Sequence, residues 1–354
     1  MLTVGRGKGI IGLFNARARH VTARTVKLFR NALPEATVLV SEDFEQAQRH
    51  ARSIARERPA VLVVGGGDGS IAKVLNLVHR ASGGWLPVFG VLRLGTGNAW
   101  SRVTGADPYV DDLPRLRSMP WPLPTRRFHL IEVEDTLCQF AGVGWDARMI
   151  NDYLRNLDRR SAQLIGSRIA TRLHRGMTGY LYSMVRYTIP EETALLLTQG
   201  PARARIENLG EPPYGIDSEA RPQLLIDAGG GPRKLLYDGA ASVAAAATEP
   251  EWGYGFRAFP FAELRSGFMN LRVYDRSAIE GAIKSVKLFR GEYPMPGMHD
   301  FLVTHARMTF SRPMPFQIAG DGLGTRESVE FRVSPVTVDL VDWSVARSSA
   351  VASA

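Results

Sequence analysis

The stretch of sequence that decides the fold is Ala60-Val61-Leu62-Val63-Val64-Gly65-Gly66-Gly67-Asp68-Gly69-Ser70. Its first five residues form a continuous apolar run, which is typical of a strand buried on both faces of a parallel sheet. The glycines that follow let backbone N–H groups turn toward a phosphate, which can approach without meeting a Cβ atom. Ser70 is expected to cap the next helix, whose N-terminus attracts anions. The stretch therefore predicts a phosphate-binding loop between a strand and a helix.

Two common phosphate-binding motifs are excluded at this loop. It is not a Walker A motif, because no Gly-Lys-Ser/Thr follows the glycines. It is not a Gly-x-Gly-x-x-Gly dinucleotide motif either, because Ser70 stands where the last glycine should be.

The residues around this loop alternate between strand-like and helix-like patterns. Amphipathic stretches predict helices over residues 22–33, 44–56 and 70–79, with apolar side chains three and four positions apart. Apolar runs predict strands over residues 9–14, 36–40, 60–64 and 87–94. Strands that alternate with helices predict an N-terminal α/β domain with a parallel sheet.

A second glycine loop, Gly95-Thr96-Gly97-Asn98, follows the strand predicted at residues 87–94. One helix and one strand separate the two loops, so a right-handed crossover places both at the carboxyl edge of one sheet, where such sheets bind ligands. Thr96 and Asn98 would offer a hydroxyl and an amide there. The alternative is that each loop is only a tight turn.

Asp68 is an acid inside a loop that is expected to hold phosphate. Its charge would repel phosphate unless a cation or a donor intervened. Mg²⁺ prefers oxygen ligands and bridges protein to phosphates, so we expect Asp68 to act through this metal. The alternative is a turn aspartate that bonds its own backbone.

The remainder of the chain is expected to be richer in β-structure. Pro114 to Pro124 is interpreted as a linker, and residues 151–187 as mostly helical and basic. Strands are predicted at residues 128–133, 139–143, 194–197, 223–228, 234–236, 269–274, 306–311 and 336–341. This pattern predicts a β-rich, antiparallel, sandwich-like C-terminal domain. We place the α/β domain at residues 1–124, completed by about 325–347, the β-rich domain at 125–324, and a loose tail at 348–354.

Bulk composition narrows the class of protein. The net charge of +9 favours contact with polyanions, namely nucleotide phosphates, an anionic membrane or nucleic acid. Nucleic acid is not expected, because the sequence carries no zinc finger or RRM signature. The single cysteine, Cys138, allows no internal disulfide and is expected to be a core residue. No apolar run reaches the ~20 residues that span a bilayer. We therefore expect a cytoplasmic protein, at most peripheral at the membrane.

Four motifs occur in order along the chain: Gly66-Gly67-Asp68-Gly69-Ser70, Gly95-Thr96-Gly97-Asn98, Gly144-Trp145-Asp146-Ala147 and Asp321-Gly322. They are similar to Gly-Gly-Asp-Gly-Thr, Gly-Thr-x-Asn, Gly-Phe-Asp-Ala and the start of Asp-Gly-Glu. Taken together, the set resembles the diacylglycerol kinase catalytic family, which includes sphingosine kinases and bacterial lipid kinases.

The resemblance implies a two-domain kinase with an interdomain cleft, which uses ATP and Mg²⁺ to phosphorylate a lipid hydroxyl. It implies nucleotide contacts from both glycine loops and from Ser41. It also implies catalytic roles for Asp68 and Asp321, with Asp68 linked to the metal. The implied partners are ATP and a lipid substrate at an anionic membrane surface, and a homodimer is a further expectation.

Several residues depart from the family pattern. The family's first nucleotide loop appears as Asn15-Ala16-Arg17-Ala18-Arg19, without its glycine, and Lys73 replaces a glutamate. Ser266 and Asn270 stand where the family has acids, and Leu323 replaces the expected general base. A catalytically weak or inactive nucleotide- or lipid-binding relative is therefore the alternative. A soluble kinase of a small molecule such as a dinucleotide is a third.

A basic amphipathic stretch is interpreted either as a solvated helix face over ordinary core or as a helix that lies on an anionic membrane surface. Its basic residues are Arg155, Arg159, Arg160, Arg168, Arg172, His174 and Arg175.

Overall fold

The computed structural model describes residues 9–18, 20–161 and 176–345, and the side chains of residues 157–161 are outside this description. These residues form two compact units. Within the described residues, unit 1 covers 9–130, 253–255 and 335–345 except for residue 19, and unit 2 covers 131–161, 176–252 and 256–334. The chain therefore leaves unit 1, builds unit 2, and returns to unit 1 at its end.

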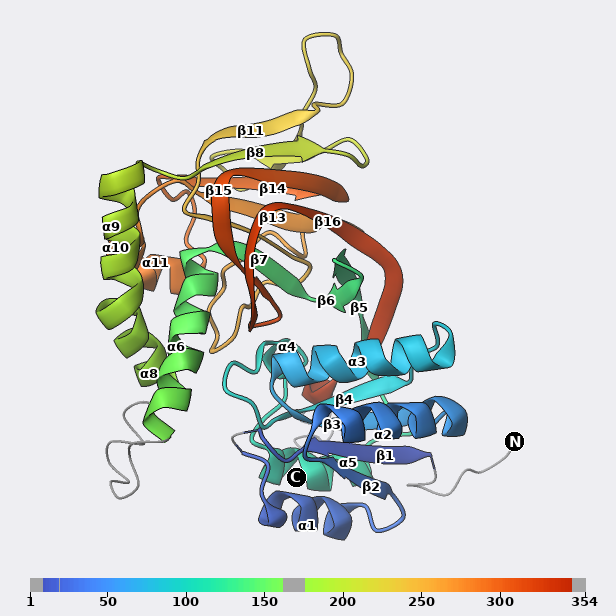
Figure 1. The fold of residues 1–354 in the computed structure, drawn as a ribbon. Coiled ribbons are helices and arrows are strands. Elements are labelled where there is room, and N and C mark those ends of the chain that lie inside the picture. Colours follow the sequence, from blue (N-terminus) through green and yellow to red (C-terminus); the bar gives the residue numbers. More distant parts are fainter. Residues whose placement is uncertain (1–8, 19, 162–175, 346–354) are drawn as a thin grey trace. The chain divides into compact units, whose positions relative to one another are not determined.

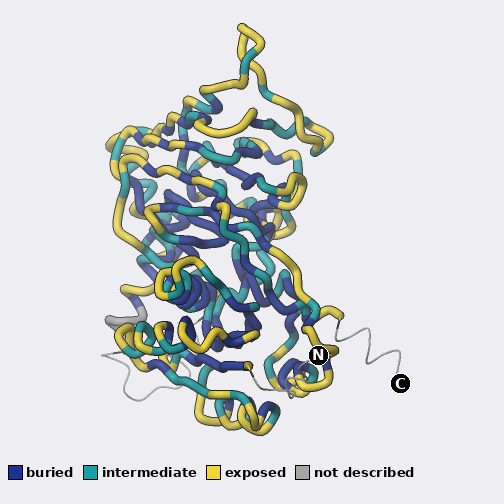
Figure 2. Tube along the Cα trace, turned by 90° about the vertical axis from the view of Figure 1, so that its right-hand side faces the viewer, coloured by how far each residue is buried: buried dark blue, intermediate teal, exposed yellow. Residues whose placement is uncertain are grey.

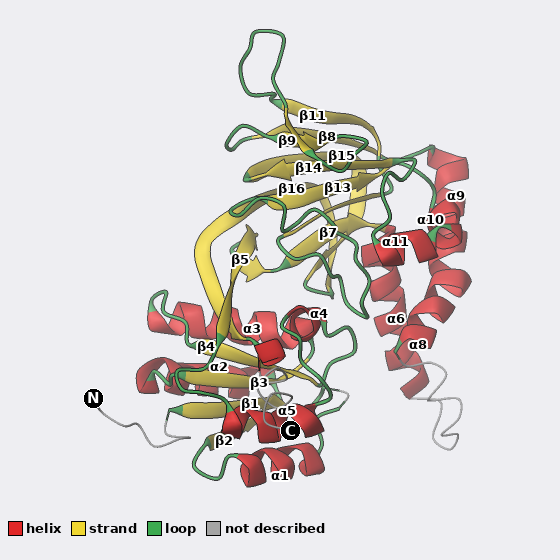
Figure 3. Cartoon of the chain, turned by 180° about the vertical axis from the view of Figure 1, so that it is seen from behind, coloured by secondary structure: helices red, strands yellow, loops and turns green. Residues whose placement is uncertain are grey.

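Unit 1 is a parallel sheet with helices on both faces (Figures 1 and 3). Neighbouring strands follow the order β4-β3-β1-β2, and all of these pairs are parallel. Its strands are β1 (Ile10–Asn15), β2 (Thr37–Ser41), β3 (Val61–Gly66) and β4 (Val88–Arg93). Its helices are α1 (Ala23–Ala32), α2 (Phe44–Glu57), α3 (Asp68–Ser82), α4 (Ala99–Val103) and α5 (Tyr109–Ser118).

The alternation of side chains along the strands divides the core of unit 1 between two faces. One face packs against α1 and α5, in a cluster that includes Phe14, Phe29, Val63 and Leu116. The rings of Phe14 and Phe29 meet edge to face with centroids 5.2 Å apart. The other face is covered by α2 and α3, which contact each other. Figure 2 shows the buried strands in dark blue and the exposed outer faces of the helices in yellow.

The strands and helices predicted around the first glycine loop are confirmed to within two residues at most ends. The interpretation of residues 114–124 as a linker is wrong at its start, because Pro114 lies inside α5. A proline at this position removes one backbone hydrogen bond of the helix, and α5 nevertheless buries Leu113 and Leu116 against the sheet.

Unit 2 is built mainly from antiparallel strands. Its strands are β6 (Thr136–Cys138), β7 (Phe140–Gly144), β8 (Arg203–Asn208), β9 (Tyr214–Ile216), β10 (Pro222–Leu224), β11 (Leu235–Ala240), β12 (Val243–Ala247), β13 (Met269–Tyr274), β14 (Met298–Val303) and β15 (His305–Ile318). Its helices are α6 (Trp145–Ser161), α8 (Met177–Ser183), the π-helix η1 (Met184–Thr188), α9 (Ile189–Gln199), α10 (Ala278–Ile283) and α11 (Ser285–Arg290).

The long strand β15 joins two antiparallel parts of unit 2. Its first half pairs with β8, whereas its last residues pair with β7. The register shifts between Thr309 and Met314, and such a bulge bends a strand. The β-rich, antiparallel character predicted for this region is confirmed. The strand predicted at residues 194–197 is wrong, because the run Ala194-Leu195-Leu196-Leu197 lies within α9. A short apolar run does not by itself distinguish a strand from a helix.

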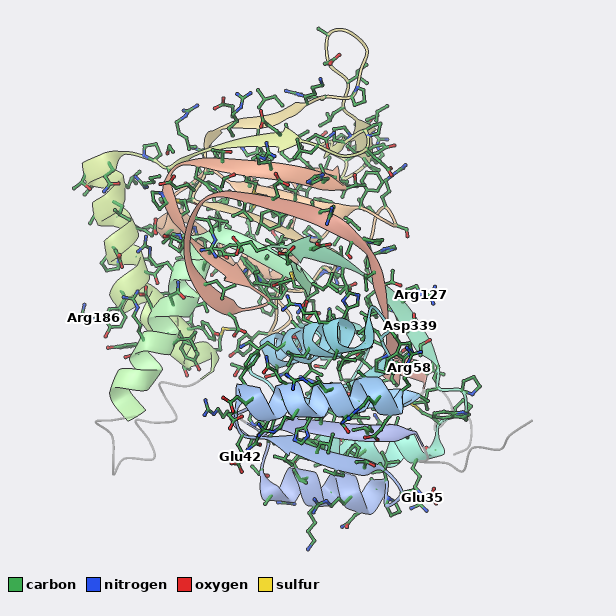
Figure 4. The ribbon with its side chains drawn as sticks, turned by 45° about the vertical axis from the view of Figure 1, so that its right-hand side comes forward. Glu35, Glu42, Arg58, Arg127, Arg186 and Asp339 are labelled. Carbon is green, nitrogen blue, oxygen red and sulfur yellow. The ribbon has the colours of Figure 1, made fainter. Side chains whose placement is uncertain are left out.

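Two strands pass from one unit to the other: β5 (Thr125–Val133) and β16 (Asp321–Val341), which pair with each other. The last part of β16 belongs to unit 1, where Leu340 pairs in parallel with Phe89 of β4. Arg127 of β5 and Asp339 of β16 form an ion pair on this part of unit 1, at 2.9 Å (Figure 4). Buried Val341 and Trp343 complete the core on the α1 and α5 face.

Candidate phosphate-binding site

The strand order of unit 1 creates a switch point between β1 and β3. The chain leaves β1 toward β2 on one side, and leaves β3 toward β4 on the other. Parallel α/β sheets bind ligands outside the carboxyl ends of the strands at such a point. The residues at these two carboxyl ends are Asn15 and Gly66.

Helix α3 begins directly at the switch point. Its N-cap is Gly67, which offers no side-chain cap. The expectation that Ser70 caps the helix is wrong, because Ser70 is the third residue of α3. Its Oγ instead accepts a hydrogen bond from Asn15 Nδ2 at 2.9 Å. The first turn of α3 therefore has no side-chain cap on its backbone N–H groups, an arrangement that favours a bound anion.

Asn15 is the residue of this site that the sequence analysis missed. The comparison of motifs identifies residues 15–19 only as the family's first nucleotide loop without its glycine, although Asn15 is the polar residue that ends the first strand. The side chain of Asn15 ties the end of β1 to the first turn of α3. A polar residue at the carboxyl end of the central strand is the signal that could have identified it.

The second glycine loop is closed by its own asparagine. Gly95 N–H donates to Asn98 Oδ1 at 2.9 Å, and Asn98 Nδ2 donates to the Gly95 carbonyl at 3.0 Å. Asn98 adopts a left-handed conformation with φ 57°, which asparagine tolerates better than most residues. Both polar groups of the Asn98 side chain thus shape the loop. Thr96 is half-buried in the same loop.

The structure brings the two glycine loops into direct backbone contact, as expected from the crossover. A Cβ added to Gly95 would lie 2.2 Å from the Gly67 Cα, a distance that no side chain could occupy. Only glycine at position 95 permits this approach. The two loops therefore lie side by side in backbone contact at the edge of the sheet.

Asp68 is buried between the loops, at 8% exposure. Its Oδ1 accepts a hydrogen bond from the Trp100 N–H at 3.2 Å. Burial raises the pKa of Asp68, and backbone N–H groups of residues 98–100 and of Asp68 itself oppose that rise. Asp68 thus anchors the start of α4 to the first loop. Its metal-linked role stays a prediction.

Ser41 lies at the carboxyl end of β2, beside Asn15 of β1. It is buried, and its hydroxyl donates to the Phe14 carbonyl at 3.4 Å. Ser41 therefore borders the switch point, with its hydroxyl engaged by the backbone. A nucleotide contact from this residue stays a prediction.

Asp321 belongs to unit 2, whereas Asp68 belongs to unit 1. Asp321 is the first residue of β16, after a hairpin whose two turn residues, Ala319 and Gly320, both have positive φ. Such two-residue turns are typical of tight hairpins. Leu323 is exposed near the same end of β16, at 43%.

The departures from the family pattern fall in different environments. Lys73 is exposed on α3, one turn beyond Ser70. Asn270 is fully buried, and its Nδ2 donates to Asp300 at 3.0 Å. Among residues 9–18, 20–161 and 176–345, no group of three His, Cys, Asp or Glu residues is arranged to hold a metal.

The Gly144-Trp145-Asp146-Ala147 motif ends β7 and begins α6 in unit 2. Asp146 is buried at 2% exposure, and neither of its carboxyl oxygens has a partner with good hydrogen-bond geometry. Burial raises the pKa of Asp146 to about 7, against opposing effects of the Ala147 N–H and the Gln317 amide. Such a group is typical either of a functional site or of a buried structural acid.

The basic stretch proposed as a membrane contact lies largely outside the described residues. Arg155 is exposed on α6 and pairs with Asp152 at 2.6 Å. The side chains of the other basic residues in that stretch lie outside the part of the chain that the structure describes. No described helix combines the length and apolar character that crossing a membrane requires.

The fold defines a class of protein: an α/β domain with two paired glycine loops, joined to a β-rich unit. Residues 14–117 match the family model of the diacylglycerol kinase catalytic domain, which supports the resemblance given by the motifs and a kinase-type phosphotransferase in general. A search of curated proteins finds no match to this chain.

Solved structures show the same fold over nearly the whole chain. A putative diacylglycerol kinase from Bacillus anthracis has a TM-score of 0.60 and 11% identity, covering 94% of this chain and 96% of that one. Another structure of a diacylglycerol kinase from Bacillus anthracis has a TM-score of 0.58, with the same identity and coverage. At this identity the comparison establishes the fold, α/β with a β-rich second part.

Proposed function

We propose that this chain is an ATP-dependent lipid kinase, which transfers the γ-phosphate of ATP to a lipid hydroxyl. The observation that carries the proposal is the backbone contact between Gly67 and Gly95 at the carboxyl ends of β3 and β4, beside the switch point of the sheet. It places two phosphate-binding loops side by side, at the edge where parallel sheets bind nucleotides.

The proposed nucleotide contacts come from both loops and from the first turn of α3. Residues 65–70 and 95–98 would surround the phosphates, with Ser41 and Asn15 at the border. The N–H groups that bind phosphate would exclude those of Gly95 and Asn98, which are bonded to Asn98 Oδ1 and Asp68. Phosphoryl transfer depends chiefly on positioning and on charge stabilisation, and backbone dipoles in a fixed arrangement provide both. The tight packing of these loops supports this role.

Magnesium is the metal that the proposal requires. It would neutralise charge on the phosphates, with Asp68 as the carboxylate nearest to the loops and phosphate oxygens as further ligands. The residues present fit this group only in part, because Asp68 is also hydrogen-bonded to the backbone. Asp321 is the proposed proton acceptor for the lipid hydroxyl.

A lipid acceptor is supported by the description of the matched domain and by the surface of unit 2. Apolar side chains that are at least 39% exposed lie on α8, η1, α9, α10 and α11, and α9 contacts α10. They are Met177, Leu181, Val185, Leu196, Leu197, Ile279, Ile283, Val286 and Phe289. Arg186 is exposed on η1 (Figure 4). Such a surface favours peripheral contact with an anionic membrane.

The experiment is a transfer assay with labelled Mg-ATP and vesicles that carry diacylglycerol, a sphingoid base or phosphatidylglycerol. We expect transfer to at least one lipid, and we expect Asp68→Ala to reduce it about a hundredfold or more. Asp111→Ala is the matched control, because Asp111 is an exposed acid on α5 away from the loops. If wild type transfers no more phosphate than Asp68→Ala on every lipid, the kinase proposal is wrong.

A catalytically weak nucleotide-binding protein is the second candidate. It is favoured by Leu323 in place of the expected base and by buried Asn270 in place of an acid. This candidate predicts that Mg-ATP raises the melting temperature of the wild type without any turnover. A melting temperature that does not respond to nucleotide would exclude both candidates.

A further inference from the structure

A third glycine-rich segment, Gly253-Tyr254-Gly255, packs as part of unit 1. The segment lies in the loop after β12, which ends at Ala247. The residues before and after it, Trp252 and Phe256, belong to unit 2. The chain therefore makes a three-residue excursion into the phosphate-binding unit. None of the sequence motifs discussed above includes this segment.

The excursion contacts the second glycine loop through backbone atoms. Tyr254 N–H donates a hydrogen bond to the Gly97 carbonyl at 2.7 Å. Gly253 has φ +121°, and a Cβ there would lie 3.0 Å from the Gly97 Cα. Gly253 thus satisfies two demands that only glycine meets, a positive φ and a close approach of two backbones.

The Gly97–Asn98 peptide is held from both sides as a result. Its carbonyl accepts from Tyr254 N–H, and its N–H, carried by Asn98, is one of the backbone groups that oppose the rise in the pKa of Asp68. Because a peptide unit is planar, fixing the carbonyl also fixes the direction of the N–H. The excursion and Asp68 together set the orientation of this peptide.

Gly255 makes a further close approach in the same unit. A Cβ at Gly255 would lie 2.6 Å from the guanidinium of Arg102, which is on α4 directly after the second loop. The segment therefore contacts both the loop and the short helix that follows it.

The excursion is rigid at its base. Trp252 N–H donates to the Phe256 carbonyl at 2.9 Å, which closes the loop. The Trp252 ring packs against the rings of Phe140 and Phe259, with centroids 6.1 and 5.6 Å away. Tyr254 itself has φ 57°, which is uncommon for an aromatic residue. A strained conformation of this kind persists only where its surroundings determine it.

We propose that Gly253-Tyr254-Gly255 is a third segment of the phosphate site, which positions the Gly95–Asn98 loop for the nucleotide. The inference rests on the proposed function. In this proposal, residues 253–255 do not contact the phosphates themselves. The segment fixes the Gly97–Asn98 peptide against Asp68 and so holds the backbone of the second loop in the arrangement that a triphosphate needs, and the loop is preorganised before binding.

The test compares Gly253→Ala with Gly267→Ala. Gly267 also has a positive φ, +79°, but a Cβ there meets nothing within 4 Å, so it controls for backbone strain alone. We expect Gly253→Ala to weaken binding of a fluorescent ATP analogue and to raise the KM for ATP by about tenfold or more. We expect kcat at saturating ATP, the KM for lipid and the melting temperature without nucleotide to stay near those of Gly267→Ala.

A second measurement avoids substitution altogether. In the wild type, we expect hydrogen exchange at the Tyr254 amide to be slow, and Mg-ATP to slow exchange in residues 253–255 together with residues 95–98. Equal ATP affinity in the two variants, or equal loss in both, would overturn the inference, as would exchange at residues 253–255 that ATP leaves unchanged. If the wild type binds no ATP, the proposed function fails first, and the inference with it.

Discussion

Asp146 is a buried acid whose pKa is raised by its surroundings. Its carboxyl has no well-formed hydrogen bond, and the position that a Gly142 side chain would occupy is close to Asp146 Oδ2 and Gln317 Nε2. A Cβ at Gly142 would lie 3.2 and 3.3 Å from these two atoms. A protonated Asp146 avoids the cost of a buried charge, which is why the pKa of Asp146 rises.

The stability of the protein is therefore expected to depend on pH through Asp146. Its pKa is about 7 when folded, against 3.8 as the ordinary value. Between these values the folded chain holds a proton that the unfolded chain has lost. The stabilisation that comes from this bound proton is complete below pH 3.8, and it is lost as the pH rises through about 7. Its full size is on the order of 4 kcal/mol.

Asp146→Asn tests this expectation, because asparagine stays neutral at every pH. Between about pH 5 and about pH 8, the free energy of unfolding of the wild type should fall relative to that of the variant. Urea denaturation across this range measures the difference. The exposed Asp111→Asn is the control, and its difference from wild type should not change with pH. A constant gap between wild type and Asp146→Asn would contradict the prediction.

At the scale of elements, strands β13 and β14 are joined by a buried ion pair. Arg272 donates to Asp300 through two nitrogens, at 2.7 and 3.0 Å, and a third nitrogen donates to the Ala258 carbonyl. The Asp300 side chain is only 1% exposed. Removing one partner would leave an uncompensated charge in the core of unit 2.

Asp300→Ala is therefore expected to lower the free energy of unfolding by about 3–5 kcal/mol. The matched control is Asp339→Ala, which breaks the exposed pair with Arg127 and should cost about 0–1 kcal/mol. Chemical denaturation of both variants measures these losses. Equal losses would show that burial of the Arg272 pair does not determine its contribution.

At the same scale, the candidate phosphate-binding site depends on contact between the two glycine loops. Neither loop forms the site alone: the first provides the N-terminus of α3, and the second provides a turn closed by Asn98. They meet because β3 and β4 are parallel neighbours, and because Gly67 and Gly95 have no side chains to keep them apart. The site is thus a property of the pair of βα connections.

For the whole molecule, the return of the chain to unit 1 is the main organising feature. Val341 and Trp343 are fully buried in the core of unit 1, and Trp343 N–H donates to the Thr104 carbonyl at 2.9 Å. Unit 1 is therefore incomplete without residues from the end of the chain. Ion pairs of Arg127 with Asp339, and of Glu132 with Arg332, show that β5 and β16 run antiparallel.

We expect a fragment of residues 1–130 to lack a cooperative thermal transition. Joining residue 130 to residues 335–345 through a short Gly/Ser linker should restore one, because antiparallel pairing brings residues 130 and 335 together. Circular dichroism and calorimetry of the two proteins provide the measurement. Trp343→Ala in the joined protein should cost about 3–5 kcal/mol. A fragment of residues 1–130 that melts cooperatively by itself would refute this prediction.

Much of the fold followed from local patterns. The apolar run before Gly65 and the amphipathic stretches on either side are local features, and they correctly predicted the parallel sheet of unit 1. Short runs in unit 2 were harder to predict, because an apolar run such as Ala194 to Leu197 is compatible with either a helix or a strand. Long-range pairing decided those elements.

By itself, the sequence determined that two glycine loops follow neighbouring parallel strands and belong at one edge of a sheet. Periodicity and glycine chemistry are local properties, so they are visible along the chain. Only the tertiary structure decided that Asn15 holds Ser70, that Asp68 is buried against the start of α4, and that Gly253-Tyr254-Gly255 packs on the second loop. These contacts join residues far apart in the sequence, and their geometry depends on how the strands are ordered and packed.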